Sequence, residues 1–445
     1  MDKKYLTFLI FILGSLAFNA TAQNCNVAYL GTKTLYKAPS AKASAAPAGY
    51  KAVFINHVGR HGARHLTKEV STSFSYGFLN NADSAGQLTT EGTRLWAMVK
   101  KLDKVEHKHV KSISAEGVAE LNGLGDRMYQ NYQAVFKGPV KLSVAITKEV
   151  RTKQSADAFL AGMKKNLKDS ATVEEYPDDL HLRFYDLSPA YTSFEESAPS
   201  NGELVRLKQQ LQVEKIEEQI AAKWLKDISV LKTATVAKLV SDVFGFASIV
   251  PSLKQEITEA GFKPGDLNFE SFFTCKEIQV LGKIDAAEDY YLKGPGVDNN
   301  GLQVRIAAPL LADFIKSTDA WLAKPEYTAR LRFAHAETIA PFAALLEMST
   351  ANKATPKGQD FEQNWQAGQV IPLSSNIQWV IYSNGKGSHL VKFLLNEKEV
   401  SISGLKPVKA GYYDWKLVRS FYLAKLQHLG LGMDSDMLQY LKELK

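Results

Sequence analysis

The alternation of short apolar runs with longer helical patterns most constrains the fold of this chain of 445 residues. Five runs have the length and apolar character of buried strands: residues 51–56, 142–147, 330–334, 376–382 and 390–395. The first run enters a glycine-containing turn at 59–62, and a helical pattern over 154–167 follows the second. Strands separated by helices predict an α/β sheet with helices on its faces.

The middle of the chain has a different pattern, with few strand signals between residues 202 and 262. Apolar side chains recur there at three- and four-residue spacing, which predicts amphipathic helices. We therefore expect an α/β core split between 45–180 and 325–445, with a mainly α-helical cap inserted over 181–324. An irregular arm is expected over 23–50.

The first 22 residues have the pattern of a signal peptide. Lys3 and Lys4 precede an apolar run over 6–18, and small residues Ala20 and Ala22 form a cleavage site. The run is short for a membrane span, so we expect cleavage after Ala22 and export to the periplasm or the medium, with an uncleaved anchor as the alternative. No later segment is expected to cross a membrane.

Composition and cysteine count narrow the class further. Hydrophobic residues make up 45% and charged residues 23% of the chain, which is typical of globular proteins and excludes a disordered or coiled-coil class. The formal net charge of +7 is a mild basic excess. The two cysteines permit one disulfide between Cys25 and Cys275, with two free thiols as the alternative.

The densest group of chemically active side chains follows the first predicted strand. Arg60, His61 and Arg64 lie there around Gly62. Arginine forks bind phosphate oxygens bidentately, and neighbouring positive charge keeps an imidazole neutral and nucleophilic. The alternatives are a zinc site on His57, His61 and His65, which the arginines disfavour, and a basic surface loop without chemistry.

Residues 60–65 resemble the Arg-His-Gly-x-Arg-x-Pro motif of the histidine phosphatase superfamily, in its acid phosphatase and phytase branch, with Leu66 in place of the proline. Residues 147–156 are similar to the second block of that family, which contains Arg151. The segment His335-Ala336-Glu337 is similar to the variant found in multiple inositol polyphosphate phosphatases. The resemblance extends from about residue 50 to the C-terminus and is weakest in the predicted cap.

The resemblance implies a histidine-phosphatase-like sheet and a phosphohistidine mechanism. His61 is the expected nucleophile, and Glu337 the expected proton donor. The expected phosphate ligands are Arg60, Arg64, Arg151 and His335. Arg183 and His65 are candidates for further substrate contacts, with a structural salt bridge as the alternative role of Arg183. No metal or cofactor is expected, because the arginines supply the positive charge.

The sequence therefore predicts an exported phosphatase that acts on inositol hexakisphosphate and lower inositol polyphosphates. A broad-specificity acid phosphatase acting on sugar phosphates is the alternative within enzymes. A non-catalytic polyphosphate-binding protein is the alternative of another class. The expected partner is a small polyanionic substrate, and neither nucleic acid nor stable membrane insertion is expected, because no basic stripe alternates with stacking aromatic residues.

Overall fold

The computed structural model describes residues 28–40, 44–167, 171–197, 202–355 and 360–445. These residues contain an eight-stranded mixed sheet in the order β3-β2-β4-β1-β5-β6-β7, with β8 paired to β6. Its strands are β1 (Lys51–Arg60), β2 (Lys141–Ile146), β3 (Thr172–Pro177), β4 (Ala329–Ala334), β5 (Asn376–Ser383), β6 (His389–Leu395), β7 (Lys398–Glu399) and β8 (Tyr413–Asp414).

The central strands β1, β4 and β2 run parallel, and β5 and β6 continue the sheet in antiparallel orientation. Strand β1 is buried along nearly its whole length and continues through Gly59, where the sequence analysis expected a turn. Strand β3 was not predicted, because its exposed edge position lacks the apolar pattern of a buried strand.

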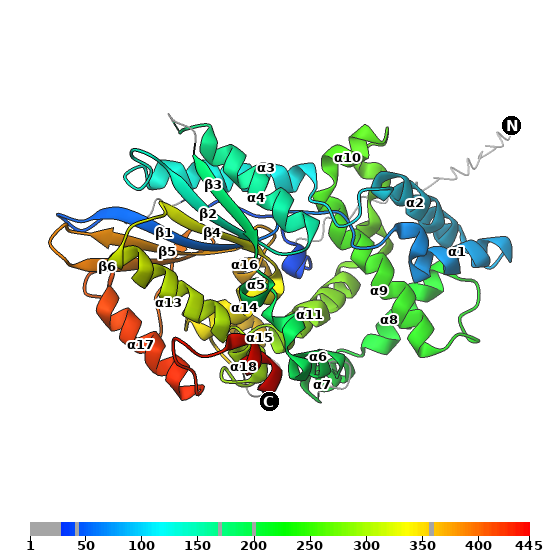
Figure 1. Ribbon diagram of the computed structural model, residues 1–445. Helices are drawn as coiled ribbons and strands as arrows, with labels where there is room; N and C mark the ends of the chain where they lie inside the picture. The colour runs from blue at the N-terminus through cyan, green and yellow to red at the C-terminus, as the bar shows by residue number, and fades with distance from the viewer. Residues whose placement is uncertain (1–27, 41–43, 168–170, 198–201, 356–359) are drawn as a thin grey trace, which may run out of the picture.

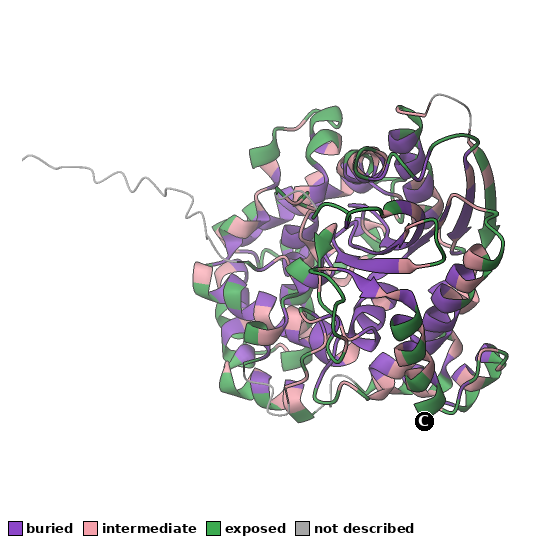
Figure 2. Cartoon of the chain, turned by 90° about the vertical axis from the view of Figure 1, so that its left-hand side faces the viewer, coloured by how far each residue is buried: buried purple, intermediate pink, exposed green. Residues whose placement is uncertain are grey.

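Helices cover both faces of the sheet (Figure 1). Helices α3 (Ala115–Asn131) and α4 (Val150–Lys164) pack on one face. Helices α13 (Ala308–Ala323), α14 (Ala336–Leu345) and α17 (Trp415–His428) pack on the other face. The sheet strands and the inner sides of these helices are buried in Figure 2. This arrangement confirms the predicted α/β class.

A helical region lies beside the sheet (Figure 1). It consists of α1 (Phe74–Ser84), α2 (Thr90–Glu106), α8 (Val213–Trp224), α9 (Thr233–Ile249) and α11 (Cys275–Leu292). Helices α1 and α2 belong to the segment 45–180, which the sequence analysis placed in the core, yet they pack against α9 and α8. Conversely, α13 lies in the predicted cap segment and packs on the sheet.

The longest apolar helical stretch of the described residues is Thr233–Ser252, which includes α9. By length and composition alone it could cross a membrane, contrary to the expectation from the sequence. Half of this stretch is buried within the structure, where α9 packs against α1 and α8. Burial among other helices accounts for its apolar composition.

The remaining elements are short. The helices are α5 (Asp179–Leu182), α6 (Pro189–Glu196), α7 (Gly202–Gln210), α10 (Lys254–Glu259), α12 (Leu302–Arg305), α15 (Phe361–Asn364), α16 (Ala367–Val370) and α18 (Met437–Glu443). The 3-10 turns are η1 (Gly31–Lys33), η2 (Val70–Thr72), η3 (Phe184–Leu187), η5 (Val250–Ser252), η6 (Pro264–Leu267) and η7 (Phe269–Phe272).

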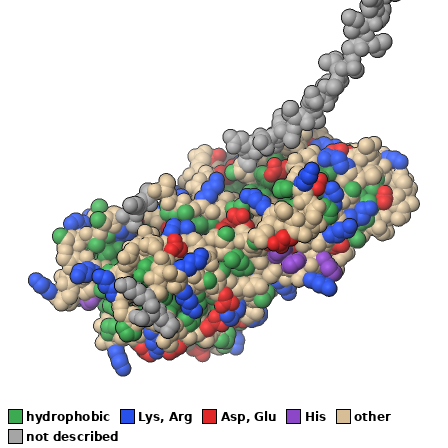
Figure 3. All heavy atoms as spheres, turned by 90° about the horizontal axis from the view of Figure 1, so that it is seen from above, with side chains coloured by type: hydrophobic (Ala, Val, Ile, Leu, Met, Phe, Trp, Pro, Cys, Tyr) green, Lys and Arg blue, Asp and Glu red, His purple; other side chains and the backbone are tan. Residues whose placement is uncertain are grey.

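On the face seen in Figure 3, basic and acidic side chains are interspersed.

Candidate active site

The candidate site lies at the carboxyl ends of the parallel strands. Arg60, the last residue of β1, pairs with Ala334, the last residue of β4, and the His61 N–H donates to the Ala334 carbonyl over 2.9 Å. His335 follows β4 directly, and Arg151 lies in the first turn of α4, shortly after β2. The register of the sheet thus brings together three sequence blocks, at the edge where α/β sheets bind ligands.

Buried groups hold the backbone of the loop after β1. The Gly62 N–H donates to Ser155 Oγ over 3.1 Å, and the Ala63 N–H donates to Glu120 Oε2 over 3.0 Å. A Cβ atom at position 62 would lie 2.8 Å from the carbonyl oxygen of Gly117. Glycine is therefore required at position 62 by the close approach of α3.

The imidazole of His61 is buried and has a defined orientation. Its Nδ1–H donates to the Gly62 carbonyl over 2.9 Å, which leaves Nε2 with its lone pair. Burial lowers the pKa of His61 well below its usual value, and the positive charges of Arg60 and Arg64 lower it further. The ring is therefore neutral and has the protonation state of a nucleophile.

Two arginines next to His61 keep N–H groups for an anion. Arg60 Nη1 donates to the carbonyls of Thr32 and Ile371 over 2.6 and 2.7 Å, and Arg151 Nη1 donates to Glu149 Oε2 over 2.7 Å. The Nε atoms of Arg60 and Arg151 are buried without a partner in the described part of the chain. Buried donors without partners are rare, and an anion would satisfy them.

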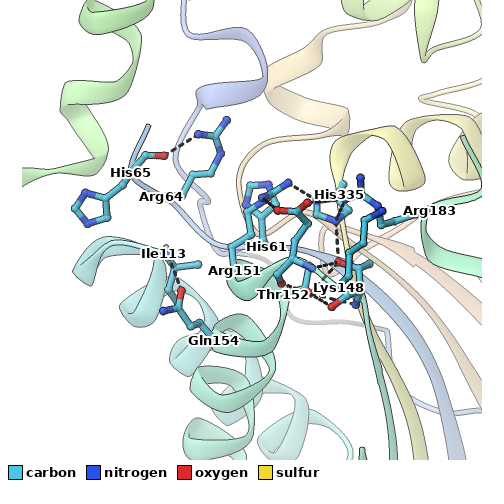
Figure 4. Close-up of polar contacts among 12 residues, drawn as sticks. His61, Arg64, His65, Ile113, Lys148, Arg151, Thr152, Gln154, Arg183 and His335 are labelled. Carbon is cyan, nitrogen blue, oxygen red and sulfur yellow. Dashed lines mark hydrogen bonds and ion pairs between the residues drawn. The ribbon is translucent and has the colours of Figure 1, made fainter. Parts of the chain in front are cut away.

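His335 lies beside His61, with 5.6 Å between the ring centroids. Its Nδ1 accepts from Arg151 Nη2 over 3.3 Å, and its Nε2 lies 3.1 Å from Thr147 Oγ1 (Figure 4). Burial, followed by the charge of Arg151, lowers the pKa of His335 to about 3. In this arrangement His335 is neutral and can donate a hydrogen bond through Nε2.

Arg183 forms the salt bridge that the sequence offered as its alternative role, and its expected contact with substrate stays a prediction. It forms an ion pair with Asp186 and lies 3.4 Å from Glu149, while its Nη1 is also 3.4 Å from His335 Nε2.

Arg64 Nη1 donates to the carbonyl of His65 over 2.7 Å. Burial and the charge of Arg60 lower the pKa of Arg64 to about 10, and it remains charged at neutral pH.

His65 does not join this group, and its expected contact with substrate stays a prediction. Its side chain points away from His61 (Figure 4), and its Nδ1 lies 3.2 Å from Glu106 Oε2. The same oxygen accepts the Leu66 N–H over 3.2 Å. A proline has no N–H, so this contact exists because Leu66 replaces the proline of the family motif.

Glu337, the second residue of α14, forms an ion pair with a residue that sequence reasoning missed. Lys293 Nζ lies 3.0 Å from Glu337 Oε1 and 2.9 Å from Asp289 Oδ1. Burial raises the pKa of Glu337, but the charge of Lys293 outweighs burial and holds the pKa well below its usual value. Lys293 follows α11 outside any recognisable motif, so the sequence gave no signal for it.

Two further predictions concern other parts of the chain. Cys275 is the first residue of α11, whereas Cys25 and the predicted signal peptide lie outside the described residues. The disulfide therefore stays a prediction. Among the described residues, no group of three His, Cys, Asp or Glu side chains is arranged to hold a metal ion.

Comparisons with known proteins show which proteins this chain resembles. The multiple inositol polyphosphate phosphatase 1 of Gallus gallus is 23% identical over 432 residues, with 90% of each chain covered. The crystal structure of the Bifidobacterium longum multiple inositol polyphosphate phosphatase in complex with inositol hexasulfate superposes with a TM-score of 0.74 at 20% identity, covering 89% of this chain and 97% of that chain. The phytase from D. castellii superposes with a TM-score of 0.67 at 13% identity, covering 94% and 88%.

A family model matches residues 53–396, more than three quarters of the chain. The matched range contains the loop after β1, the start of α4 and the start of α14, which together form the site described above. The agreement between this range and the site geometry leads to one conclusion: the chain belongs to the histidine phosphatase superfamily, branch 2.

Proposed function

We propose that the protein hydrolyses phosphate monoesters of inositol hexakisphosphate and lower inositol polyphosphates through a phosphohistidine at His61. The observation that carries this proposal is the neutral imidazole of His61, whose Nε2 is free of its proton, next to buried arginine N–H groups without partners. Such an arrangement places a nucleophile and preorganised positive charge around one phosphoryl group.

In the first step, His61 Nε2 attacks phosphorus in line with the leaving oxygen. The N–P bond forms as the bond between phosphorus and the inositol oxygen breaks. Arg60, Arg64, Arg151 and His335 hold the equatorial oxygens and neutralise the charge that develops on them. Glu337, when protonated, donates its proton to the leaving oxygen, which departs as an alcohol.

In the second step, a water molecule attacks the phosphohistidine. Glu337, now a carboxylate, accepts a proton from this water as the new P–O bond forms and the N–P bond breaks. Inorganic phosphate leaves, His61 regains its neutral form, and Glu337 is again protonated. The positive charge that these two reaction steps require comes from the arginines of the site.

The preference for inositol polyphosphates is supported by three observations. Two of the relatives that cover about nine tenths of this chain are multiple inositol polyphosphate phosphatases, and one of them was crystallised with inositol hexasulfate. The chain carries a formal net charge of +7. Arg183 and Lys293 extend the positive charge beyond the four groups that hold the reacting phosphate. A polyanion uses such outlying cations more fully than a monophosphate does.

We also propose that the protein is exported. The basic start, the apolar run over residues 6–18 and the small residues at Ala20 and Ala22 support a signal peptide that is removed after Ala22. An exported location also permits a disulfide between Cys25 and Cys275. N-terminal sequencing of the secreted protein tests the cleavage site, and thiol titration under denaturing conditions tests the disulfide.

The experiment that tests the function measures phosphate release from inositol hexakisphosphate and from glycerol 1-phosphate between pH 3 and 8. The wild-type protein is compared with His61→Ala and with the control Lys283→Met. Lys283 lies on α11, the helix that precedes Lys293, and its substitution removes a surface ion pair with Glu362 of α15. We expect His61→Ala to lose at least about 10³-fold in kcat/KM.

The outcomes separate the candidate functions. Activity on glycerol 1-phosphate alone would favour the acid phosphatase, and tight binding of inositol hexakisphosphate without release would favour the binding protein. An active His61→Ala variant would rule out His61 as the nucleophile. In the wild-type protein, the phosphoenzyme trapped by an alkaline quench should carry a phosphate that is stable to base and is lost on later acid treatment, as expected for phosphohistidine rather than for a phosphate ester of serine or threonine.

A further inference from the structure

Lys293 links the helical region to Glu337, the proposed proton donor of the site, through an ion pair. It follows α11, and its ammonium group lies between Asp289 on that helix and Glu337 at the start of α14, at 2.9 and 3.0 Å. Lys293 and Asp289 are largely buried, whereas 31% of the Glu337 side chain remains exposed. The carboxyl group of Glu337 is thus accessible to substrate but occupied by a cation.

This ion pair favours the ionised form of Glu337, whereas the proposed role of Glu337 requires its protonated form. A carboxylate paired with an ammonium group holds no proton, whereas a proton donor must hold one when the substrate is bound. Asp289 offers Lys293 a second partner, so the lysine is not committed to Glu337 alone. The other charged or titratable groups that face the pair come from α6, η3, β1, the loop after β1, the residue before α14 and α11 itself: Glu195, Tyr191, Tyr185, Arg60, Arg64, His335 and Asp285.

We propose that Lys293 is a positioning residue that keeps Glu337 deprotonated until a second phosphate group of the substrate binds the lysine. The proposal rests on the proposed function and adds a basis for discriminating polyphosphates from monophosphates. Inositol hexakisphosphate carries phosphate groups on carbons next to the reacting one. A neighbouring phosphate can contact the ammonium group of Lys293 while the reacting phosphate occupies the arginine cluster.

The consequence is a proton donor that depends on the substrate. When the neighbouring phosphate neutralises Lys293, Glu337 loses the charge that favours its ionised form and accepts a proton from water at higher pH than in the empty site. A monophosphate leaves Lys293 on Glu337, so protonation of its leaving group requires more acid. The wild-type protein should therefore remain active on inositol hexakisphosphate at pH values where its activity on glycerol 1-phosphate has fallen.

The test compares the pH dependence of kcat, which reports groups in the enzyme–substrate complex. The basic limb of each profile is the pH range in which kcat falls as the pH rises. In the wild-type protein, we expect this limb to lie about one pH unit or more higher for inositol hexakisphosphate than for glycerol 1-phosphate. Lys293→Met should move the limb for glycerol 1-phosphate to higher pH and narrow this difference. Lys293→Arg keeps a cation and should preserve the difference, as should the matched control Lys283→Met.

A second variant predicts a shift of opposite sign. Asp289→Asn removes the competing partner of Lys293, so the lysine acts on Glu337 alone, and the basic limb for glycerol 1-phosphate should move to lower pH. A merely structural role of Lys293 would lower rates without moving either limb. Thermal unfolding of each variant shows that it is folded, and Asp289→Asn tests the pair if Lys293→Met does not fold.

The proposal is overturned if the two limbs coincide in the wild-type protein, or if Lys293→Met leaves their separation unchanged. Failure of the proposed function is a separate result, because the wild-type protein would then release no phosphate from inositol hexakisphosphate at any pH. Even then, an unchanged limb for glycerol 1-phosphate in Lys293→Met and Asp289→Asn would overturn the control of Glu337 by Lys293.

Discussion

The proposed phosphate-binding end of the site and its proposed proton-donor end are held in place by different parts of the molecule. At the phosphate-binding end, Arg60, His61 and His335 follow parallel strands, and backbone groups of the sheet and its loops fix them. At the proton-donor end, Glu337 faces Lys293, which directly follows α11 and lies outside the sheet motifs. Changes at the first end should affect every phosphate ester alike, whereas changes at the second should depend on the leaving group.

The largest effect that separates the two ends is expected for Glu337→Gln. Glutamine keeps the shape of the side chain but has no proton to donate, so kcat/KM for inositol hexakisphosphate should fall about 10²- to 10⁴-fold. The rate on 4-nitrophenyl phosphate should fall much less, because its weakly basic leaving group departs without a proton. Parallel assays on both substrates check this expectation, and equal losses would show that Glu337 acts on the phosphate rather than on the leaving group.

A smaller and uniform effect is expected for Glu106→Ala. This change leaves the buried N–H groups of His65 and Leu66 without their acceptor, which costs about 1–3 kcal/mol of folding stability. Arg64 bonds to the carbonyl of His65, so a displaced loop should lower kcat/KM about 10- to 100-fold.

The loss in Glu106→Ala should be the same for inositol hexakisphosphate and 4-nitrophenyl phosphate. Glu106→Gln, which keeps an acceptor oxygen, is the matched control and should retain more activity. Adding Leu66→Pro to Glu106→Ala restores the proline of the family motif and should recover part of the stability in chemical denaturation. A loss that depended on the leaving group would contradict the separation of the two ends.

The smallest effect on activity, but a measurable effect on stability, is expected at His57. Burial and the charge of Arg332 lower the pKa of His57 to about 3, whereas the unfolded chain binds this proton near pH 6.5. The unfolded state therefore binds more protons between these values, and stability falls as the pH drops from 6.5 toward 3. The variant His57→Leu lacks this contribution.

Melting temperatures at pH 7 and pH 4 check this expectation. The decrease in Tm between the two values should be smaller in His57→Leu than in the wild-type protein, and kcat at pH 6 should change little. An equal decrease in both proteins would show that His57 is not a source of acid sensitivity. The contrast with His61 matters here, because both imidazoles are buried and neutral but only His61 lies next to the unpartnered arginine donors.

The sheet could be predicted largely from the sequence, because its central strands are short runs rich in apolar residues. Strand β3 escaped prediction at the exposed edge, where polar residues such as Glu174 and Glu175 are tolerated. The packing of α1 and α2 with the helical region also escaped prediction. Their partners α8 and α9 lie more than 100 residues later in the chain, and local periodicity carries no information about such contacts.

The candidate site was predicted to the extent that its residues belong to motifs. Parallel strands end at one edge, so Arg60, Arg151 and His335 had to meet there. His65 lies apart from the other candidates because the chain is extended at Arg64, which pairs with Ile113, and successive side chains of extended backbone point in opposite directions. Lys293 was missed because only tertiary packing brings its ammonium group to Glu337.

The anchoring of Arg60 also affects where the polypeptide can be shortened. One of its two backbone acceptors, the carbonyl of Thr32, belongs to the arm before the sheet, and Lys33 pairs with Asp285 of α11 over 3.5 Å. A polypeptide trimmed to begin at β1 would contain every residue of the three motifs. It would nevertheless lack a backbone oxygen that orients the guanidinium beside the nucleophile. The functional boundary of the enzyme therefore lies upstream of its first strand, in a segment without catalytic residues.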